Sequence, residues 1–154
     1  MARYQSIIDV LVDDEDFERV YFDHETELPT PYREIGFLKR SSLQEQPGKG
    51  RELHKKWADI CAISSGRVKV IIEEERKATD SKVWTDIDII AKCRYLWADG
   101  RTFPFDPECS LFVLLNDNVH NVPERVMRNY GNLKIVIICS KESFRERYTK
   151  DATL

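Results

Sequence analysis

The stretch from Trp57 to Lys77 constrains the fold of this 154-residue chain more than any other. Two runs rich in apolar and β-branched residues, WADICAI and VKVIIEEERK, flank the short sequence SSGR. This pattern is typical of two antiparallel strands joined by a tight turn, so we predict a β-hairpin. Its second strand ends in three carboxylates and two cations: Glu73, Glu74, Glu75, Arg76 and Lys77.

Alternation along the second strand decides which of these charges can act together. Side chains two residues apart share a face at a spacing of about 6.7 Å, so Glu73, Glu75 and Lys77 are predicted to lie together. Carboxylate oxygens are the ligands that divalent cations such as Mg²⁺ prefer. Asp59 in the first strand and Glu75 in the second therefore form a candidate metal site with Lys77 beside it. The alternative is a strand end whose charges are simply solvated.

The register of the hairpin decides whether Asp59 belongs to this face. A three-residue loop, Ser64–Gly66, with its glycine in the left-handed conformation, places Asp59 on the face of Glu75. A two-residue loop, Ser65–Gly66, places Asp59 on the other face with Glu74, as a plain salt-bridge arrangement. Both loops suit the sequence, and we predict the first.

This spacing resembles the signature of the PD-(D/E)XK nuclease superfamily. In that family an acidic residue opens one strand and a (D/E)XK tripeptide closes the next. Asp59 matches the acid, and after 15 intervening residues Glu75-Arg76-Lys77 matches the tripeptide, although Ala58 replaces the usual proline. The resemblance implies that Asp59, Glu75 and Lys77 are catalytic. It further implies a metal-dependent nuclease acting on DNA, with RNA as an alternative substrate.

The resemblance also implies a cofactor and further ligands. The cofactor would be Mg²⁺ or Mn²⁺, held by Asp59 and Glu75 together with Glu73. The first helix of the family often supplies an additional glutamate near the metal. Glu18 is the candidate for that ligand here, and Glu15 is the next.

The distribution of charge bears on the partner. The net charge of −3 by itself argues against a nucleic-acid partner. Between Asp9 and Glu27, however, nine acidic residues face one arginine, a balance of −8 that leaves +5 for the rest of the chain. Lys39, Arg40, Lys49 and Arg51 lie in the segment before the hairpin, where we predict that they contact phosphates. An ordinary charged surface is the alternative.

The cysteine pattern and the hydropathy bear on the compartment. The four cysteines are widely spaced, with no CxxC. We therefore predict buried, reduced thiols and a cytoplasmic protein. No apolar run approaches the roughly 20 residues of a membrane span, and no signal peptide opens the chain, so no membrane partner is expected.

The remaining periodicity predicts the other elements of one domain over residues 1–154. We predict helices over 3–22, 80–98, 122–130 and 141–150, strands over 34–41, 109–115 and 133–139, and loops over 44–51 and 101–108. Apolar strands joined through helices favour parallel pairing with both faces covered. The sequence thus predicts a three-layer α/β/α fold with a mixed central sheet, and this order of elements is typical of restriction-endonuclease-like proteins.

A metal-dependent nuclease is therefore the predicted function. The resemblance allows a further active-site cation from the helix over 80–98, where Lys82 and Lys92 are the candidates. Specificity would come from the loops over 39–51 and 99–108 or from formation of a homodimer. Two alternatives are a non-catalytic nucleic-acid-binding module on the same fold and a regulatory α/β domain.

Overall fold

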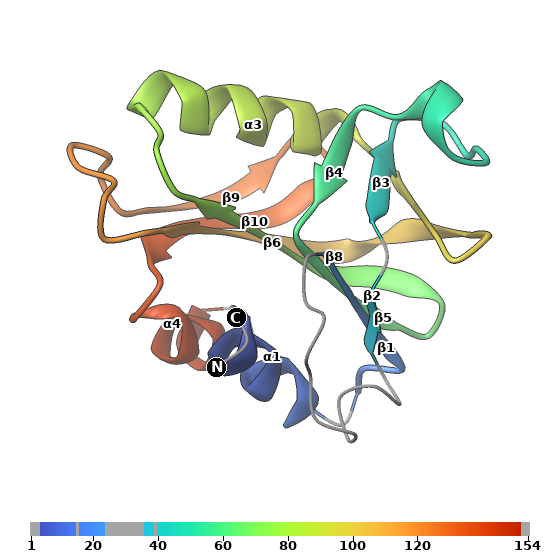
Figure 1. Cartoon of the computed structure of the whole chain (residues 1–154), viewed down its shortest axis with the longest axis horizontal. Coiled ribbons are helices and arrows are strands. Elements are labelled where there is room, and N and C mark those ends of the chain that lie inside the picture. Colours follow the sequence, from blue (N-terminus) through green and yellow to red (C-terminus); the bar gives the residue numbers. More distant parts are fainter. Residues whose placement is uncertain (1–3, 15, 24–35, 39, 152–154) are drawn as a thin grey trace.

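The structure is a computed structural model that describes residues 4–14, 16–23, 36–38 and 40–151. This part of the chain forms one mixed α/β domain (Figure 1). Its helices are α1 (Gln5–Val12), the short 3-10 helix η1 (Arg51–Leu53), α3 (Asp80–Lys92) and α4 (Phe144–Asp151). Its strands are β1 (Arg19–Phe22), β2 (Gly36–Leu38), β3 (Ser41–Gln44), β4 (Lys56–Ala58), β5 (Ile60–Ser64), β6 (Arg67–Glu75), β7 (Tyr95–Ala98), β8 (Arg101–Leu115), β9 (Arg125–Tyr130) and β10 (Leu133–Ser140).

The main sheet has the order β2-β1-β5-β6-β8-β10-β9. Its centre is parallel, because β8 lies between β6 and β10 and runs in the same direction as both. The hairpin β5–β6 and the outer pair β9–β10 are antiparallel. The predicted mixed sheet is therefore confirmed.

A second, smaller sheet is built on the same long strand. The first residues of β8 pair with β7, and β3 joins β7 to β4, all antiparallel. The 15-residue strand β8 thus belongs to both sheets, and its pairing with β6 is interrupted between Phe105 and Ser110, where it passes from one to the other. Pro107 lies in this interruption, where a missing N–H breaks no ladder bond.

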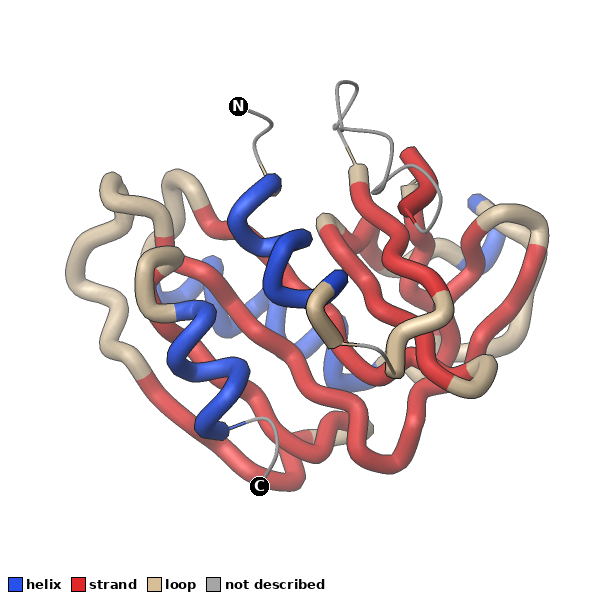
Figure 2. Tube along the Cα trace, turned by 90° about the horizontal axis from the view of Figure 1, so that it is seen from below, coloured by secondary structure: helices blue, strands red, loops and turns tan. Residues whose placement is uncertain are grey.

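Helices cover both faces of the main sheet. α3 lies on one face, and α1 and α4 lie on the other, as the two views show (Figures 1 and 2). Alternate side chains of β6 pack into two hydrophobic cores, one on each face of the sheet. Ile71 packs with Val83 and Ile87 of α3, whereas Ile72 packs on the side of α1 and α4. The order helix layer, sheet, helix layer follows from this alternation.

The predicted helix over 3–22 is wrong beyond Val12. The chain leaves α1 at Asp13, and Arg19–Phe22 instead forms β1 against β5. Val20, Tyr21 and Phe22 are all buried there. A strand that is covered on both faces has a continuous run of apolar residues. Periodicity alone does not distinguish such a strand from a segment of a buried helix.

Three predictions between residues 95 and 130 are also wrong. Tyr95–Ala98, predicted as the end of a helix, is β7, and residues 101–108, predicted as a loop, begin β8. A two-residue turn of Asp99 and Gly100, both left-handed at φ 53° and 71°, joins them. Residues 122–130, predicted as a helix, contain the edge strand β9. Its side chains are largely exposed, so its sequence lacks the alternation of apolar and polar residues that marks a strand.

The remaining predicted helices and strands are confirmed in whole or in part. The helix over 80–98 is confirmed as α3, which ends at Lys92, and the strands over 109–115 and 133–139 and the final helix are confirmed. All four cysteines are buried and free. The predicted strand over 34–41 corresponds to β2 and the first residue of β3. Among the described residues, no helix is both long and apolar enough to cross a bilayer.

Candidate functional site

The turn of the β5–β6 hairpin differs from the prediction. Ser64 pairs with Arg67, so the loop has two residues, Ser65 and Gly66. Both are left-handed, at φ 52° and 72°, as the mirror-image turns of tight hairpins require. The predicted three-residue loop is therefore wrong.

A β-bulge nevertheless restores the face that the prediction needed. β6 carries one extra residue, Lys69, next to the turn, and the register shifts there by one. Beyond the bulge Ile60 lies opposite Ile72, so Asp59, one residue earlier, comes beside Glu73. The bulge thus places Asp59 with the odd-numbered glutamates despite the two-residue turn.

Asp59 itself lies at a junction rather than within a strand. It separates β4, in the small sheet, from β5, in the main sheet. Its N–H donates to Glu73 Oε1 at 3.3 Å, and its Oδ2 accepts from the Glu74 N–H at 2.8 Å. These two bonds hold the Asp59 carboxylate against the final residues of β6.

Four carboxylates and two lysines gather on the α3 face at this end of β6. Lys56 Nζ lies 3.7 Å from Glu73 Oε2 and 3.5 Å from Asp86 Oδ1. Glu75 shares a side-chain hydrogen bond with Asp86. Lys82 Nζ donates to both Asp86 oxygens at 2.7 and 2.8 Å. We call this group the carboxylate cluster: Asp59, Glu73, Glu75 and Asp86, with Lys56 and Lys82.

Sequence reasoning missed Asp86. Thr79 caps α3 by accepting the Lys82 N–H, and the helix buries Val83, Ile87 and Ile90 against the sheet. Asp86 lies on this same buried stripe, three residues after Val83 and four before Ile90. A charged residue at an apolar position of an amphipathic helix was the available signal.

Burial and crowding change the acidities within the cluster. The pKa of Glu73 is raised well above its usual value by burial and then by the charge of Asp59, while Lys56 opposes the change. Burial, followed by the hydrogen bond and charge of Asp86, raises the pKa of Glu75 to about 8. The pKa of Asp86 is lowered, because bonds from Glu75 and Lys82 outweigh its burial. Glu75 and Asp86 therefore share one proton, which resides on Glu75.

The other predicted ligands and the lysine predicted to be catalytic lie elsewhere. β6 ends at Glu75, and Lys77 beyond it is exposed and has no hydrogen bond or ion pair to a described residue. Glu18 directly precedes β1 and lies beside the end of β5 that leads into the turn. Its N–H donates to Ile63 O at 2.8 Å, and Asp59 lies beyond the opposite end of β5. Glu15 lies outside the described residues. Of the two lysines considered on α3, Lys82 joins the cluster.

The opposite face of β6 carries a separate ion pair. Glu74 Oε1 accepts from Arg76 Nε at 3.0 Å, and Lys141 Nζ lies 3.1 Å from Glu74 Oε2. The predicted separation of Glu74 and Arg76 from Glu73 and Glu75 is confirmed. Glu74 ties the strand to the segment that precedes α4 and is not available to the cluster.

The predicted phosphate contacts lie around β3, η1 and the connection between them. Lys39 lies outside the described residues. Arg40 is exposed, pairs with Asp23 at 3.6 Å and stacks its guanidinium 5.2 Å from the Trp57 ring. Lys49 and Arg51 are exposed and have no ion pair to a described residue.

The loop that carries Lys49 and Arg51 is anchored at its glycines. Gln44 Nε2 donates to Gly50 O at 2.8 Å, and Thr102 Oγ1 donates to Gly48 O at 2.9 Å. A β-carbon at Gly48 would come within 2.2 Å of the Leu53 side chain, which would have to shift to accommodate it. The loop therefore presents its two cations from a fixed backbone.

His54 reports the sign of the potential in this region. Its pKa is lowered first by burial and then by the positive charges of Arg51, Arg40 and Lys56. The side chains of Arg51, Arg40 and Lys56 therefore place positive charge around His54, and such charge suits a polyanionic partner.

The chemistry of the cluster fits a hard divalent cation. Its acidic donors are all carboxylate oxygens, which Mg²⁺ and Mn²⁺ prefer. Among the described residues, however, no three His, Cys, Asp or Glu side chains are already arranged to hold a metal ion. Lys56 and Lys82 lie between the carboxylates, so metal binding would require these side chains to move.

Comparisons with known proteins do not identify the site, so its interpretation as a metal site depends on its geometry alone. Neither a protein-family model, nor a curated protein, nor a solved structure matches the chain.

Proposed function

We propose that this protein is a metal-dependent nuclease that hydrolyses phosphodiester bonds in DNA, with Mg²⁺ or Mn²⁺ as its cofactor. The observation that carries the proposal is the carboxylate cluster, in which two acids of β6 and one of α3 are buried beside the half-buried Asp59. Crowding four carboxyl groups at a mostly buried position is costly in the metal-free protein, as the raised pKa values of Glu73 and Glu75 indicate. Such a cost is typical of a site shaped for a cation.

The arrangement around the cluster supports a restriction-endonuclease-like protein of the PD-(D/E)XK superfamily. An acid precedes the first strand of a hairpin and a second acid closes its other strand, followed by α3 and the parallel strand β8. The edge strand β9 and the small sheet depart from the expected order of elements. The proposal therefore depends on the hairpin, α3 and β8.

The residues have separable roles in the proposed reaction. Asp59, Glu73 and Glu75 would hold the metal, with Asp86 as a further ligand. The bound metal would polarise the phosphate and lower the pKa of the attacking water. Lys82 and Lys56, rather than the exposed Lys77, are the cations nearest to the acids. Freed from Asp86, they would stabilise the charge that develops on the phosphate.

Proton release links metal binding to pH. Glu75 keeps its proton until about pH 8 in the metal-free protein. A carboxyl group binds a metal through its ionised form, so Glu75 must lose this proton first. Metal affinity, and with it cleavage, should increase as the pH rises toward 8.

The surface beside the cluster supports a nucleic-acid substrate. Arg51 in η1 and Lys56 in β4 are separated by four residues, and Lys56 contacts Glu73 and Asp86, so the exposed cations of the anchored loop lie close to the cluster along the chain. Exposed cations of this kind contact phosphates without reading sequence. Formation of a homodimer and a cytoplasmic location remain predictions.

A non-catalytic nucleic-acid-binding domain on the same fold is the second candidate. It is favoured by the ion pairs that Lys56 and Lys82 already make with Asp86. If these pairs persist when nucleic acid binds, the acids serve only to position lysines. Binding without cleavage would then result.

Cleavage assays separate the two candidates. The full chain is incubated with plasmid DNA, single-stranded DNA and RNA in the presence of Mg²⁺, Mn²⁺ or EDTA. We expect metal-dependent cleavage that Asp59→Ala and Glu75→Ala each abolish, whereas Glu142→Ala, at an exposed turn, cleaves as the wild type does. Cleavage that persists in both site variants would refute the proposed site. Retained binding without cleavage by the wild type would select the non-catalytic domain.

A further inference from the structure

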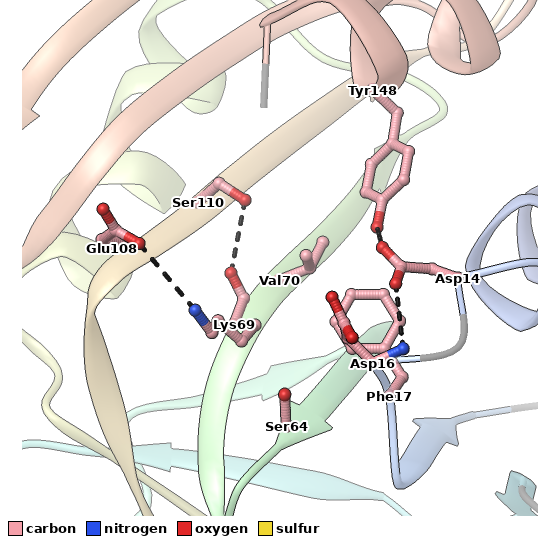
Figure 3. Close-up of a pocket in the computed structure, with 9 residues that line it drawn as sticks. All are labelled: Asp14, Asp16, Phe17, Ser64, Lys69, Val70, Glu108, Ser110 and Tyr148. Atoms are coloured by element: carbon pink, nitrogen blue, oxygen red, sulfur yellow. Dashed lines mark hydrogen bonds and ion pairs between the residues drawn. The ribbon is translucent and has the colours of Figure 1, made fainter. Parts of the chain in front are cut away.

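A second site lies on the other face of the main sheet. A pocket of about 240 Å³ opens between the α1–β1 connection, α4 and the strands β6 and β8 (Figure 3). Glu75 of the carboxylate cluster lies six positions along β6 from Lys69, at this pocket, or about 20 Å at the usual rise of a strand. The pocket is therefore independent of the proposed nuclease site.

Asp14 forms a rigid wall of this pocket. Tyr148 Oη donates to Asp14 Oδ2 at 2.7 Å, and the Asp16 N–H donates to Asp14 Oδ1 at 3.1 Å. The first bond joins α4 to the connection after α1 and fixes the Tyr148 ring at the rim (Figure 3). The Asp16 carboxylate makes no hydrogen bond or ion pair with a described residue, so it is available to a ligand.

Ser64 supplies an independent indication of a ligand. Its side chain lines the pocket, and its residue is only 9% exposed. Figure 3 shows the hydroxyl directed into the pocket, where no described residue bonds it. The neighbouring Ser110 hydroxyl differs, because it donates to Lys69 O at 3.3 Å. The Ser64 hydroxyl therefore has no partner among the described residues and faces the pocket, where a ligand atom could form a hydrogen bond with it.

The charges and rings select the chemical class of ligand. The carboxylates of Asp14, Asp16 and Glu108 line the pocket, while Lys69 in its lining is itself paired with Asp106 at 3.7 Å and with Glu108 at 3.9 Å. The lining is therefore negative, which disfavours phosphates and carboxylates. The Phe17 and Tyr148 rings suit an organic cation better than a bare metal ion, which needs converging oxygens. Among the described residues no such convergence of three acids exists.

We propose that this pocket binds a small aliphatic amine through its primary ammonium group. Asp16 and the Ser64 hydroxyl accept hydrogen bonds from the ammonium, and the Phe17 and Tyr148 rings cover its carbon chain. A primary ammonium has three donors and no acceptor, which matches two oxygen acceptors in a negative pocket. The volume lies just below the roughly 300 Å³ at which pockets for drug-sized ligands begin, so the ligand is small.

Calorimetric titration of the full chain with putrescine at low salt tests this site. We expect saturable binding to one site, weakened at least about tenfold by Asp16→Asn and several-fold by Ser64→Ala, because a hydrogen bond to a charged group is lost in each. Asp117→Asn, an exposed acid outside the pocket, is the matched control and should bind as the wild type does. Asp16 is also exposed, so Asp16→Asn should fold as the wild type does. This variant therefore tests the proposal even if Ser64→Ala is unstable.

Two comparison ligands sharpen the test. Tetramethylammonium is a monocation without an N–H donor, whereas putrescine is a dication with two primary ammonium groups, and we expect tetramethylammonium to bind at least about tenfold more weakly. Ca²⁺ should not compete with putrescine. Absence of putrescine binding, equal binding by all three variants, or displacement of putrescine by Ca²⁺ would each overturn the proposal. None of these results depends on nuclease activity.

Discussion

Replacement of Glu75 by glutamine should stabilise the metal-free protein, and the gain should grow with pH. Glu75 is buried against α3, and burial together with its bond to Asp86 raises its pKa from 4.5 to about 8. Glutamine has nearly the same shape and can donate an N–H to Asp86 as the protonated acid does. It cannot ionise, however, so it removes the proton equilibrium while leaving the packing intact.

The sign of the effect follows from where each state of the wild type loses the Glu75 proton. The unfolded chain loses it near pH 4.5 and the folded protein only near pH 8. Stability of the wild type therefore falls as the pH rises through this window and levels off above it. The variant has no such loss, so its advantage is near zero at pH 4.5 and reaches its maximum above pH 8.

The pKa values of Glu75 in the unfolded and folded states also set an upper limit on the gain in stability. One pKa unit corresponds to about 1.4 kcal/mol, so the rise to about 8 allows at most about 5 kcal/mol. Asp86 contributes with the opposite sign because its pKa is lowered by the same pair. Lys82 and Lys56 also screen the ionised pair, so we expect a gain of about 2 kcal/mol at pH 8.5.

Urea unfolding followed by tryptophan fluorescence between pH 4.5 and 9, in EDTA, measures this gain. Glu142→Gln, an exposed acid, is the control and should show no pH-dependent difference from the wild type. A gain that is constant across the pH range would show that Glu75 titrates normally. Destabilisation of Glu75→Gln at pH 8.5 would refute the placement of a shared proton between Glu75 and Asp86.

Three further outcomes are expected. Gly131→Ala should destabilise the fold by about 2–3 kcal/mol in thermal unfolding, because its β-carbon would lie 2.6 Å from a carbonyl oxygen at φ 57°. Gly100→Ala, at φ 71° with nothing within 4 Å, should cost about 1 kcal/mol, and equal effects would contradict this reading. Phe144→Ala should cost about 3–4 kcal/mol in urea unfolding, since the ring is 2% exposed and packs edge-on against another ring. Charge reversal at Lys49 and Arg51 should weaken DNA binding equally across sequences and reduce its salt dependence in fluorescence titrations, and an unchanged affinity at low salt would exclude the loop.

The sequence predicted the structure correctly where a local residue pattern is compatible with only one type of element. Alternation in the β6 segment separates Glu74 from Glu73 and Glu75 without knowledge of the rest of the fold. The helical period after Thr79 likewise predicts α3, because its apolar residues recur on a single stripe. The Asp99-Gly100 dipeptide was a strong turn signal that the prediction did not use, and with it β7 and β8 could have been recognised.

Other features of the candidate site depend on pairing between distant segments. The bulge at Lys69 has no glycine or proline to mark it, yet it decides the face of Asp59. Asp86 reaches the site only because α3 packs over the end of β6. Lys77 could not be excluded from the sequence, because the position at which β6 ends depends on where β8 stops pairing with it.

The double membership of β8 has a consequence for the growing polypeptide on the ribosome. The hairpin β5–β6 and its neighbour β1 can associate as soon as residue 75 has emerged, since their pairing is local. The small sheet can close only after Arg101–Pro104 has been made, and the parallel centre only after Ser110–Leu115. Until then the apolar edge of β6 is uncovered, while about 40 further residues are synthesised over roughly 2–8 s. This nascent chain exposes the edge of an unfinished sheet, which is the kind of aggregation-prone surface that chaperones protect.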